Sequence, residues 1–401
     1  MKPQQKPSHA YLLRDRSKEP PPTTRSRPAH LDAIIIPASR PASWFTDLIW
    51  LSAVLGAVLV VICSRQTKVE QLATRIARVP GARGLLIDVR NPPDLGLPTR
   101  TSAERFQVAS AGRVSDLSLK RNLGLLIARR HGWRKVAFVD DDITHSRPSR
   151  FTRMAAQLES HQIVGMVCRS YPDSSVACHA RRLARLPQDN FVTGAVLGVN
   201  CVDLPIPFFP NIYNEDWLFF SNAALQRELC TVGDAIQLEY DPFASPARAR
   251  HEEFGDVVAE GLFTIIGDAL PDTKMMALLM EATTTSYWKY FVDARSTMLD
   301  DTRDILTNYP HDDNSQDVVN KAIQSLNAAV EQQESIDNDL YPDFVDAWWQ
   351  DAENWAGICQ KTHPLRSTRD AMDALGIENW RVARFGDPDV ASAHVPLLVK
   401  C

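Results

Sequence analysis

The stretch Lys135-Val136-Ala137-Phe138-Val139-Asp140-Asp141-Asp142 joins a short apolar run to three consecutive carboxylates. The length and composition of the run predict a buried strand over 135–139. Adjacent carboxylates repel one another, so the cluster is costly unless a cation neutralises it. Oxygen ligands of this kind select a hard divalent ion, Mg²⁺ or Mn²⁺, which typically also binds substrate phosphates. A solvated acidic turn, with Asp142 capping the next helix, fits the run equally well.

Similar apolar runs lie on both sides of this one and alternate with helical patterns. A helix is predicted over 117–130, directly before the acidic strand. Short apolar strands separated by helices predict an α/β fold with a mostly parallel sheet covered on both faces. In such sheets, ligands bind at the carboxyl ends of the strands. The other predicted strands are 33–37, 57–63, 84–89, 163–169, 191–199 and 236–240.

Composition divides the 401 residues into three regions. Residues 1–30 are basic and Pro-rich, which predicts a disordered tail with little to bury. Residues 31–270 form the α/β domain. Long helical periodicities over 275–307 and 315–334 predict a mainly helical region at 271–401. The whole chain has a net charge of −5, so it offers no general basic field, and no nucleic-acid partner is predicted.

One segment, residues 48–63, bears on membrane insertion. It contains no charged residue and follows a basic tail, as a signal anchor would. A spanning helix requires about 20 apolar residues, and the segment divides into a helix over 45–55 and a strand over 57–63. We therefore expect no stable membrane span. The seven cysteines form no CxxC pair and most lie in apolar runs, which indicates free thiols in a reducing, cytoplasmic compartment.

Two further clusters carry chemistry. Glu215 and Asp216 enter a helix predicted over 218–229, where carboxylates either cap the helix or act as a general base. Arg248, Arg250 and His251 are predicted between a strand and a helix. They would either complete a metal shell and hold phosphate oxygens, or form a surface turn.

In this order, the parts resemble the nucleotide-sugar-dependent glycosyltransferases of the GT-A fold, broadly the family-2-like group. Glucosyl-phosphoglycerate and mannosylglycerate synthases are distant members of that group. The resemblance covers residues 32–265, and the combined order of the motifs is specific although no single motif is. The matching pieces are the strand and loop 34–40, the helix segment 120–124, the Asp-x-Asp counterpart 140–142, the strand 191–195, the pair Glu215-Asp216, and His251.

The resemblance implies transfer of a sugar from a UDP- or GDP-linked donor to a hydroxyl acceptor, with Mn²⁺ or Mg²⁺ as cofactor. Asp142 would be the more direct metal ligand, Asp140 would flank the ion and face the sugar or ribose, and His251 would bind the same ion. Asp216, or Glu215 in its place, would take the proton from the acceptor hydroxyl. If the enzyme retains anomeric configuration, no such base is needed, and the sequence does not fix the stereochemistry.

The remaining donor contacts follow from the same resemblance. Many relatives end the second strand with an aspartate that reads the nucleotide, whereas this strand ends Cys63-Ser64-Arg65. Asp88, at the end of the third strand, would substitute for it, and the choice between uracil and guanine stays open. The other residues expected to contact the donor are Pro37, Ser39, Arg40 and Asp141. Arg121, Arg248 and Arg250 are expected to contact the pyrophosphate of the donor or the acceptor.

Other functional classes fit less of the sequence. A sugar nucleotidyltransferase should carry a Gly-rich loop after its first strand, and residues 37–41 contain no glycine. No GxGxxG follows an early strand, which argues against a dinucleotide-binding oxidoreductase. A noncatalytic scaffold with a GT-A fold remains the alternative from a different class. The C-terminal helices would cover the acceptor site, form a homodimer, or both.

Overall fold

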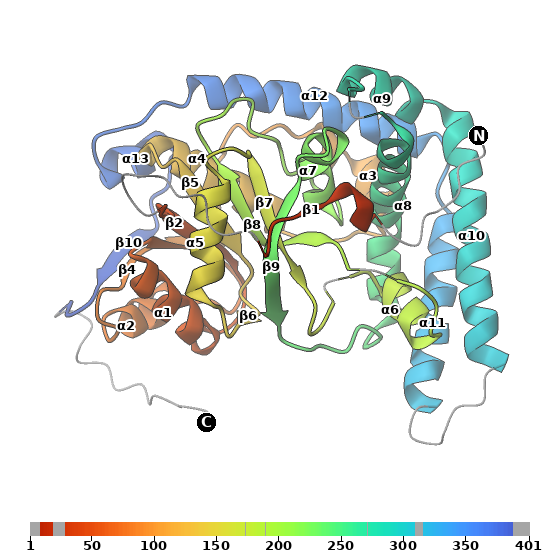
Figure 1. Cartoon of the computed structure of the whole chain (residues 1–401), viewed down its shortest axis with the longest axis horizontal. Helices are drawn as coiled ribbons and strands as arrows, with labels where there is room; N and C mark the ends of the chain where they lie inside the picture. Colours follow the sequence, from red (N-terminus) through yellow and green to blue (C-terminus); the bar gives the residue numbers. More distant parts are fainter. Residues whose placement is uncertain are drawn as a thin grey trace.

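The computed structural model describes residues 9–18, 29–172, 174–188, 190–270, 272–308 and 316–387. A mixed, mostly parallel sheet runs through the molecule, with helices on both faces and a helical C-terminal region on one side (Figure 1). The predicted α/β class is therefore confirmed. The order of the strands across the sheet is β1-β9-β7-β8-β5-β2-β3-β4-β10, and the short β6 (Ile143–Thr144) pairs with β9.

Four parallel strands form the first half of the sheet, and they match the predicted strands within one residue. They are β2 (Ala33–Ala38), β3 (Val58–Cys63), β4 (Arg83–Asp88) and β5 (Lys135–Val139). β2 pairs with both β3 and β5, so the chain segments that follow these three strands leave the sheet at one edge. That edge holds the acidic cluster, as the rule for parallel sheets predicts.

The second half of the sheet contains a strand that runs in the opposite direction. β8 (Val192–Asn200) is antiparallel to both β5 and β7 (Ile163–Cys168). Its first residues therefore lie beside the end of β5, and the Asp140 N–H donates to the Ala195 carbonyl at 2.9 Å. β9 (Cys230–Gln237) is parallel to β7. The strand predicted at 236–240 is thus wrong in position, since most of it precedes that range.

The uncharged segment 48–63 divides as predicted. α1 (Thr46–Leu55) ends at Gly56, whose φ of 66° is a left-handed conformation that glycine adopts without steric cost. β3 follows at once and is fully enclosed by its neighbours. Among the residues that the structure describes, no helix is long and apolar enough to cross a membrane.

Apolar side chains of the central strands alternate between two cores, one on each face of the sheet. Ile35 belongs to the larger core, whereas Ile34 and Ile36 belong to the other. The predicted helix at 117–130 is confirmed as α4 (Leu117–His131). The other helices of this region are α2 (Val69–Ile76), α3 (Glu104–Ala109), α5 (Pro148–Gln157), α6 (Val176–Leu183), α7 (Glu215–Leu225), α8 (Pro246–Asp268) and the short 3-10 helices η2 (Ala42–Phe45) and η3 (Arg100–Ser102).

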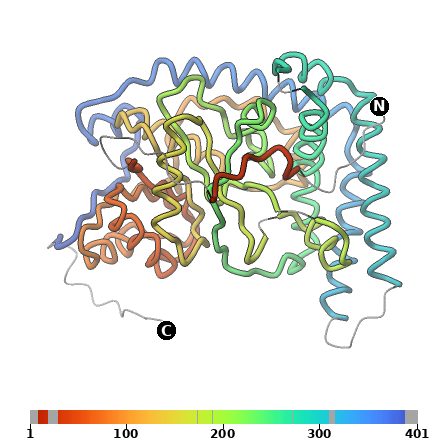
Figure 2. The backbone as a smooth tube through the Cα atoms, viewed as in Figure 1, coloured from red at the N-terminus to blue at the C-terminus, as the bar shows by residue number. Residues whose placement is uncertain are grey.

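The C-terminal region is helical, as predicted, but it does not form a separate core. Trp288 and Trp355 belong to the same apolar cluster as Ile35 of β2. The periodicity over 275–307 is interrupted at Thr283 and Thr284. The chain then returns to the sheet, where β10 pairs antiparallel with β4 at the edge (Figure 2). The elements are α9 (Met275–Ala282), α10 (Thr285–Asn308), α11 (Gln316–Glu334), α12 (Leu340–Lys361), α13 (Thr368–Ala374) and β10 (Trp380–Arg384).

Part of the predicted disordered tail is folded. Residues 9–15, which we call the N-terminal strap, contain the 3-10 helix η1 (Ala10–Leu12) and the strand β1 (Arg14–Asp15). β1 pairs in parallel with β9, and His9 and Leu12 are 5% and 1% exposed. The expectation of a tail with little to bury is therefore wrong for this stretch. The rest of that prediction falls mainly on residues 1–8 and 19–28, outside the described part of the chain.

Candidate functional site

The acidic cluster lies at the carboxyl end of β5 and is paired with an arginine. Both oxygens of Asp141 are engaged: Oδ2 accepts the N–H groups of Ser39 and Arg40 at 2.6 and 2.9 Å, and Oδ1 accepts the Arg40 guanidinium. Arg40 also donates to Oδ2 of Asp142 at 2.9 Å. Asp141 and Asp142 are 3% and 6% exposed, and β6 rather than a helix follows them. The alternative of a solvated helix-capping turn is therefore wrong for these two residues.

Asp140 differs from its neighbours because it faces a cavity. Its side chain is 23% exposed, and Nη2 of Arg121 lies 3.1 Å from its Oδ1. Nη1 of the same guanidinium lies 2.5 Å from Oε1 of Glu215. Burial alone would lower the pKa of Arg121, but the charges of Asp140 and Glu215 outweigh it and raise that pKa above its ordinary value. Arg121 thus joins two carboxylates from distant parts of the chain.

A glycine makes room for this guanidinium. A Cβ at Gly194, near the start of β8, would collide with the Nη1, Nη2 and Cζ atoms of Arg121. This explains why the sequence has Thr193-Gly194-Ala195 at the edge where β8 meets the end of β5. The Gly194 N–H is also used, since it donates to Oδ2 of Asp216 at 2.5 Å.

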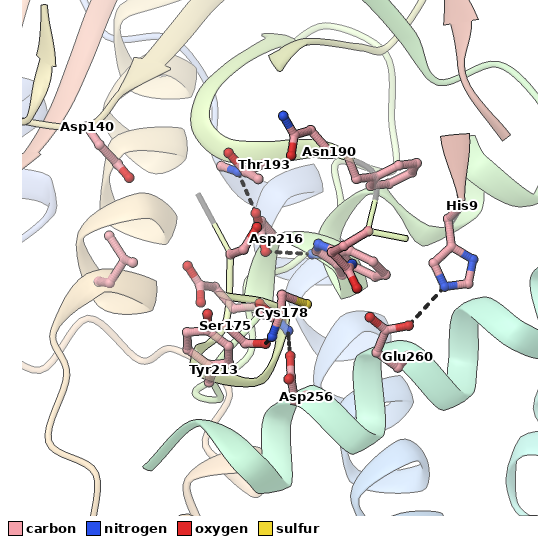
Figure 3. A pocket seen from close by; sticks show the side chains of 18 of the residues that line it. His9, Asp140, Ser175, Cys178, Asn190, Thr193, Tyr213, Asp216, Asp256 and Glu260 are labelled. Atoms are coloured by element: carbon pink, nitrogen blue, oxygen red, sulfur yellow. Dashed lines mark hydrogen bonds and ion pairs between the residues drawn. The ribbon is translucent and has the colours of Figure 1, made fainter. Parts of the chain in front are cut away.

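The cavity has a volume of about 170 Å³ and is lined by both predicted and unpredicted residues (Figure 3). It is bounded by the end of β5, the start of β8, the first turn of α7, one face of α8, and the N-terminal strap. Its carboxylates are Asp140, Glu215, Asp216, Asp256 and Glu260, and its aromatic residues include Phe191, Tyr213 and Trp217. The structure therefore brings Asp140, from the first predicted cluster, together with the predicted pair Glu215 and Asp216 around one space.

Asp216 is held in the first turn of α7. The helix begins at Glu215, three residues earlier than predicted, and Asp216 is 7% exposed. Its Oδ1 accepts the Trp217 N–H at 2.9 Å, and a carboxylate at a helix N-terminus is favoured by the helix dipole. The preceding Asn214 has a left-handed φ of 60°, and its amide donates to Asp256 at 2.7 Å. The geometry fixes the Asp216 carboxylate on the cavity wall.

The third predicted cluster lies elsewhere. Arg248, Arg250 and His251 belong to the first turns of α8, so their prediction as a loop is wrong. Arg248 pairs with Glu252 at 2.6 Å, and Arg250 pairs with Glu331 on α11. These three residues do not line the cavity. No three His, Cys, Asp or Glu side chains converge as a metal site within the described ranges, so His251 is not brought together with Asp140 and Asp142.

Several residues predicted to contact a donor connect neighbouring strand ends. Pro37 lies within β2, and the backbone N–H groups of Ser39 and Arg40 donate to the Asp141 carboxylate. Nζ of Lys120, which is 1% exposed, donates to the Ala38 carbonyl and to Ser64 Oγ at 2.8 and 2.7 Å. Burial lowers the pKa of Lys120 despite the nearby Asp116 carboxylate. Asp88 ends β4 as predicted and is held by Arg90, and that interaction lowers the pKa of its carboxyl group.

Several cavity residues were not predicted as site residues. His9 comes from the N-terminal strap, and its Nε2 lies 3.0 Å from Oε2 of Glu260 on α8. Its ring packs at 5.5 Å from that of Trp217. Arg113 lies in the loop before α4 and also lines the cavity. Asp256 and Glu260 are four residues apart on one helix, a spacing that could have indicated a shared polar face. A lone histidine in a basic tail carries no such signal.

Comparison with known proteins assigns the chain to no family. No family model matches the chain, and no curated protein is significantly similar to it. The function is therefore argued from the geometry of the site.

Proposed function

We propose that the chain is a metal-dependent glycosyltransferase that moves a sugar from a nucleoside-diphosphate sugar to a hydroxyl acceptor. One observation carries the proposal: Arg121 joins Asp140 to Glu215, on the wall of a cavity that also holds Asp216. A strand-end aspartate for the donor and a fixed carboxylate for the acceptor then face the same space. Asp140 lies at the carboxyl end of the parallel strand β5, and this edge is where α/β sheets bind ligands.

Asp216 is the proposed general base. Its carboxylate is fixed by the N–H groups of Gly194 and Trp217, and it lies on the cavity wall where an acceptor hydroxyl would sit. A positioned base contributes on the order of 10²–10⁴-fold to a rate. Glu215 is less suited to this role, because its carboxylate forms a buried ion pair with the Arg121 guanidinium. Glu215 instead orients Arg121, which in turn orients Asp140.

The chemistry of the acidic cluster fits a hard divalent ion. Asp140 and Asp142 supply carboxylate oxygens, and Mg²⁺ in phosphate-binding sites is commonly held by one or two carboxylates together with substrate phosphates. When bound, Mn²⁺ or Mg²⁺ would offset the negative charge on the departing nucleoside diphosphate. His251 is not part of this proposed ligand set. Ser39, Arg40 and Asp88, at neighbouring strand ends, are proposed to position the nucleotide.

Nucleotide binding tests the proposal directly. Calorimetry with UDP, GDP, ADP and dTDP, with and without Mn²⁺, should show metal-dependent binding of one nucleotide. A variant with Asp140→Ala and Asp142→Ala should lose that binding by at least tenfold. Asp317→Ala is the matched control, since the Asp317 side chain is 74% exposed on α11. If the folded wild type binds none of the four, the glycosyltransferase proposal fails and a noncatalytic scaffold is favoured.

A further inference from the structure

The cavity carries more negative than positive charge. Five carboxylates line it, whereas Arg113 and Arg121 are the guanidinium groups on its walls. Arg121 is engaged by Glu215 and Asp140. Arg295, which does not line the cavity, donates to Asp256 at 2.8 Å. It also pairs with Glu253, so the two together add no net positive charge near the cavity. A small, partly enclosed space with this balance repels anions and attracts cations.

Glu260 shows where a cation would bind. The residue is 8% exposed, so more than nine-tenths of its surface is buried. Its Oε2 pairs with His9 at 3.0 Å, and its Oε1 has no hydrogen-bond partner among the residues that the structure describes. Figure 3 shows this second oxygen turned away from His9, toward the side of Cys178. This oxygen is accessible from the cavity, so a ligand there can donate to it, and a hydrogen bond between charged groups is stronger than one between neutral groups.

The same region of the cavity has an aromatic wall. Trp217 and Phe191 lie 5.1 Å apart between ring centroids, and both line the cavity together with Tyr213. The faces of such rings attract ammonium groups, most strongly when water is excluded. Carboxylates and aromatic faces together form the usual environment for an organic cation. Neither feature would bind a carboxylate or a phosphate.

We propose that the acceptor carries a protonated amine, which donates to Oε1 of Glu260 and lies against Trp217. This inference rests on the glycosyltransferase function proposed above, and it assigns the chemical class of the second substrate. The acceptor hydroxyl would then face Asp216, the fixed carboxylate of the same cavity. A volume of about 170 Å³ is below the roughly 300–1,000 Å³ of drug-sized pockets, so it holds one small group such as an amino sugar ring. Acidic acceptors are disfavoured.

Paired probes test this assignment without knowledge of the natural acceptor. Glucosamine, 2-deoxystreptamine and serinol are each compared with their N-acetylated forms, which lose the positive charge, by calorimetry and saturation-transfer NMR on the full chain. At least one amine should bind ten times more tightly than its acetylated partner. Binding of no amine, or equal binding of both forms, overturns the proposal.

A variant places the binding at Glu260. Glu260→Gln removes the charge and keeps the shape, and it should weaken amine binding at least tenfold. Glu334→Gln, at an exposed position of α11, is the control and should leave it unchanged. Equal loss in both variants, or no loss in Glu260→Gln, contradicts the assignment. Nucleotide binding is measured in parallel: a protein that binds nucleotide but no amine refutes only this inference, and one that binds amine but no nucleotide refutes the proposed reaction.

Discussion

Nη1 of Arg121 lies 2.5 Å from Oε1 of Glu215, although the two residues are 94 positions apart in the chain. The contact joins α4 to the first turn of α7, and both side chains are buried. Since the same guanidinium reaches Asp140, the spacing of the proposed donor and acceptor carboxylates depends on one side chain. The predictions that follow start from this contact.

Replacing Arg121 should destabilise the fold. Arg121→Met leaves Glu215 buried without its cation, and removing one partner of a buried pair typically costs about 3–5 kcal/mol. Urea unfolding should therefore show a free energy of unfolding lower by at least about 3 kcal/mol. A loss below about 1 kcal/mol would mean that the contact does not hold α4 and α7 together.

A methyl group at Gly194 should disturb the site more than the fold as a whole. The Cβ of Gly194→Ala would displace the Arg121 guanidinium, and overpacking of this kind costs about 1–3 kcal/mol. Gly357→Ala is the matched control, because nothing lies within 4 Å of a Cβ there, within the helix α12. That control should gain about 0.5–1 kcal/mol from alanine's helix propensity. Urea unfolding of both variants measures the contrast, and equal effects would contradict it.

The buried ion pairs of Arg295 should join the C-terminal helices to the floor of the cavity. Arg295 of α10 is 1% exposed and donates to Glu253 and Asp256 of α8. Arg295→Met leaves both carboxylates buried without this cation, so unfolding free energy should fall by about 3–5 kcal/mol. Arg303→Met removes a more exposed pair with Asp300 and should cost less than about 1 kcal/mol. Similar losses of unfolding free energy in the two variants, measured by chemical unfolding, would contradict this prediction.

His179 should make stability depend on pH. Burial, together with the nearby positive charges of Arg182 and Arg248, lowers the pKa of His179 to about 4. In the unfolded chain this pKa is about 6.5. The unfolded state therefore binds a proton first as pH falls below 6.5, and stability is lost until the pH reaches the folded pKa. Between pH 7 and 5, wild type should lose about 2 kcal/mol more than His179→Asn, which does not titrate. Parallel pH slopes in urea titrations would show that folding does not lower the pKa of His179.

The strands of the first half of the sheet were predictable because each is a continuous apolar run bounded by polar residues. The pattern fails where polar and apolar residues mix. β9 contains Thr231, Gly233 and Asp234, so its buried positions do not form one run. β10 is short and half-exposed, and only its pairing with β4 makes it a strand.

The residues of the candidate site were likewise predictable only where they form a local pattern in the sequence. Asp140 and Asp216 are each part of a local cluster, and a cluster can be seen in sequence. Arg121 and Glu215 were each named, but their contact could not be predicted, since it depends on how α4 and α7 pack. His9 gives no local signal at all, because its role comes from a contact with Glu260 that spans 251 positions.

The N-terminal strap also constrains the order in which the chain can assemble. Residues 14 and 15 are synthesised well before Cys230 and Thr231, with which they pair. The contact between His9 and Glu260 needs a still later segment. The strap therefore has none of these native contacts while the central strands form. Long-range pairing of this kind is intrinsically slow. A segment that is synthesised well before its partners is thus among the last to take its native position, and through His9 it forms part of the cavity wall.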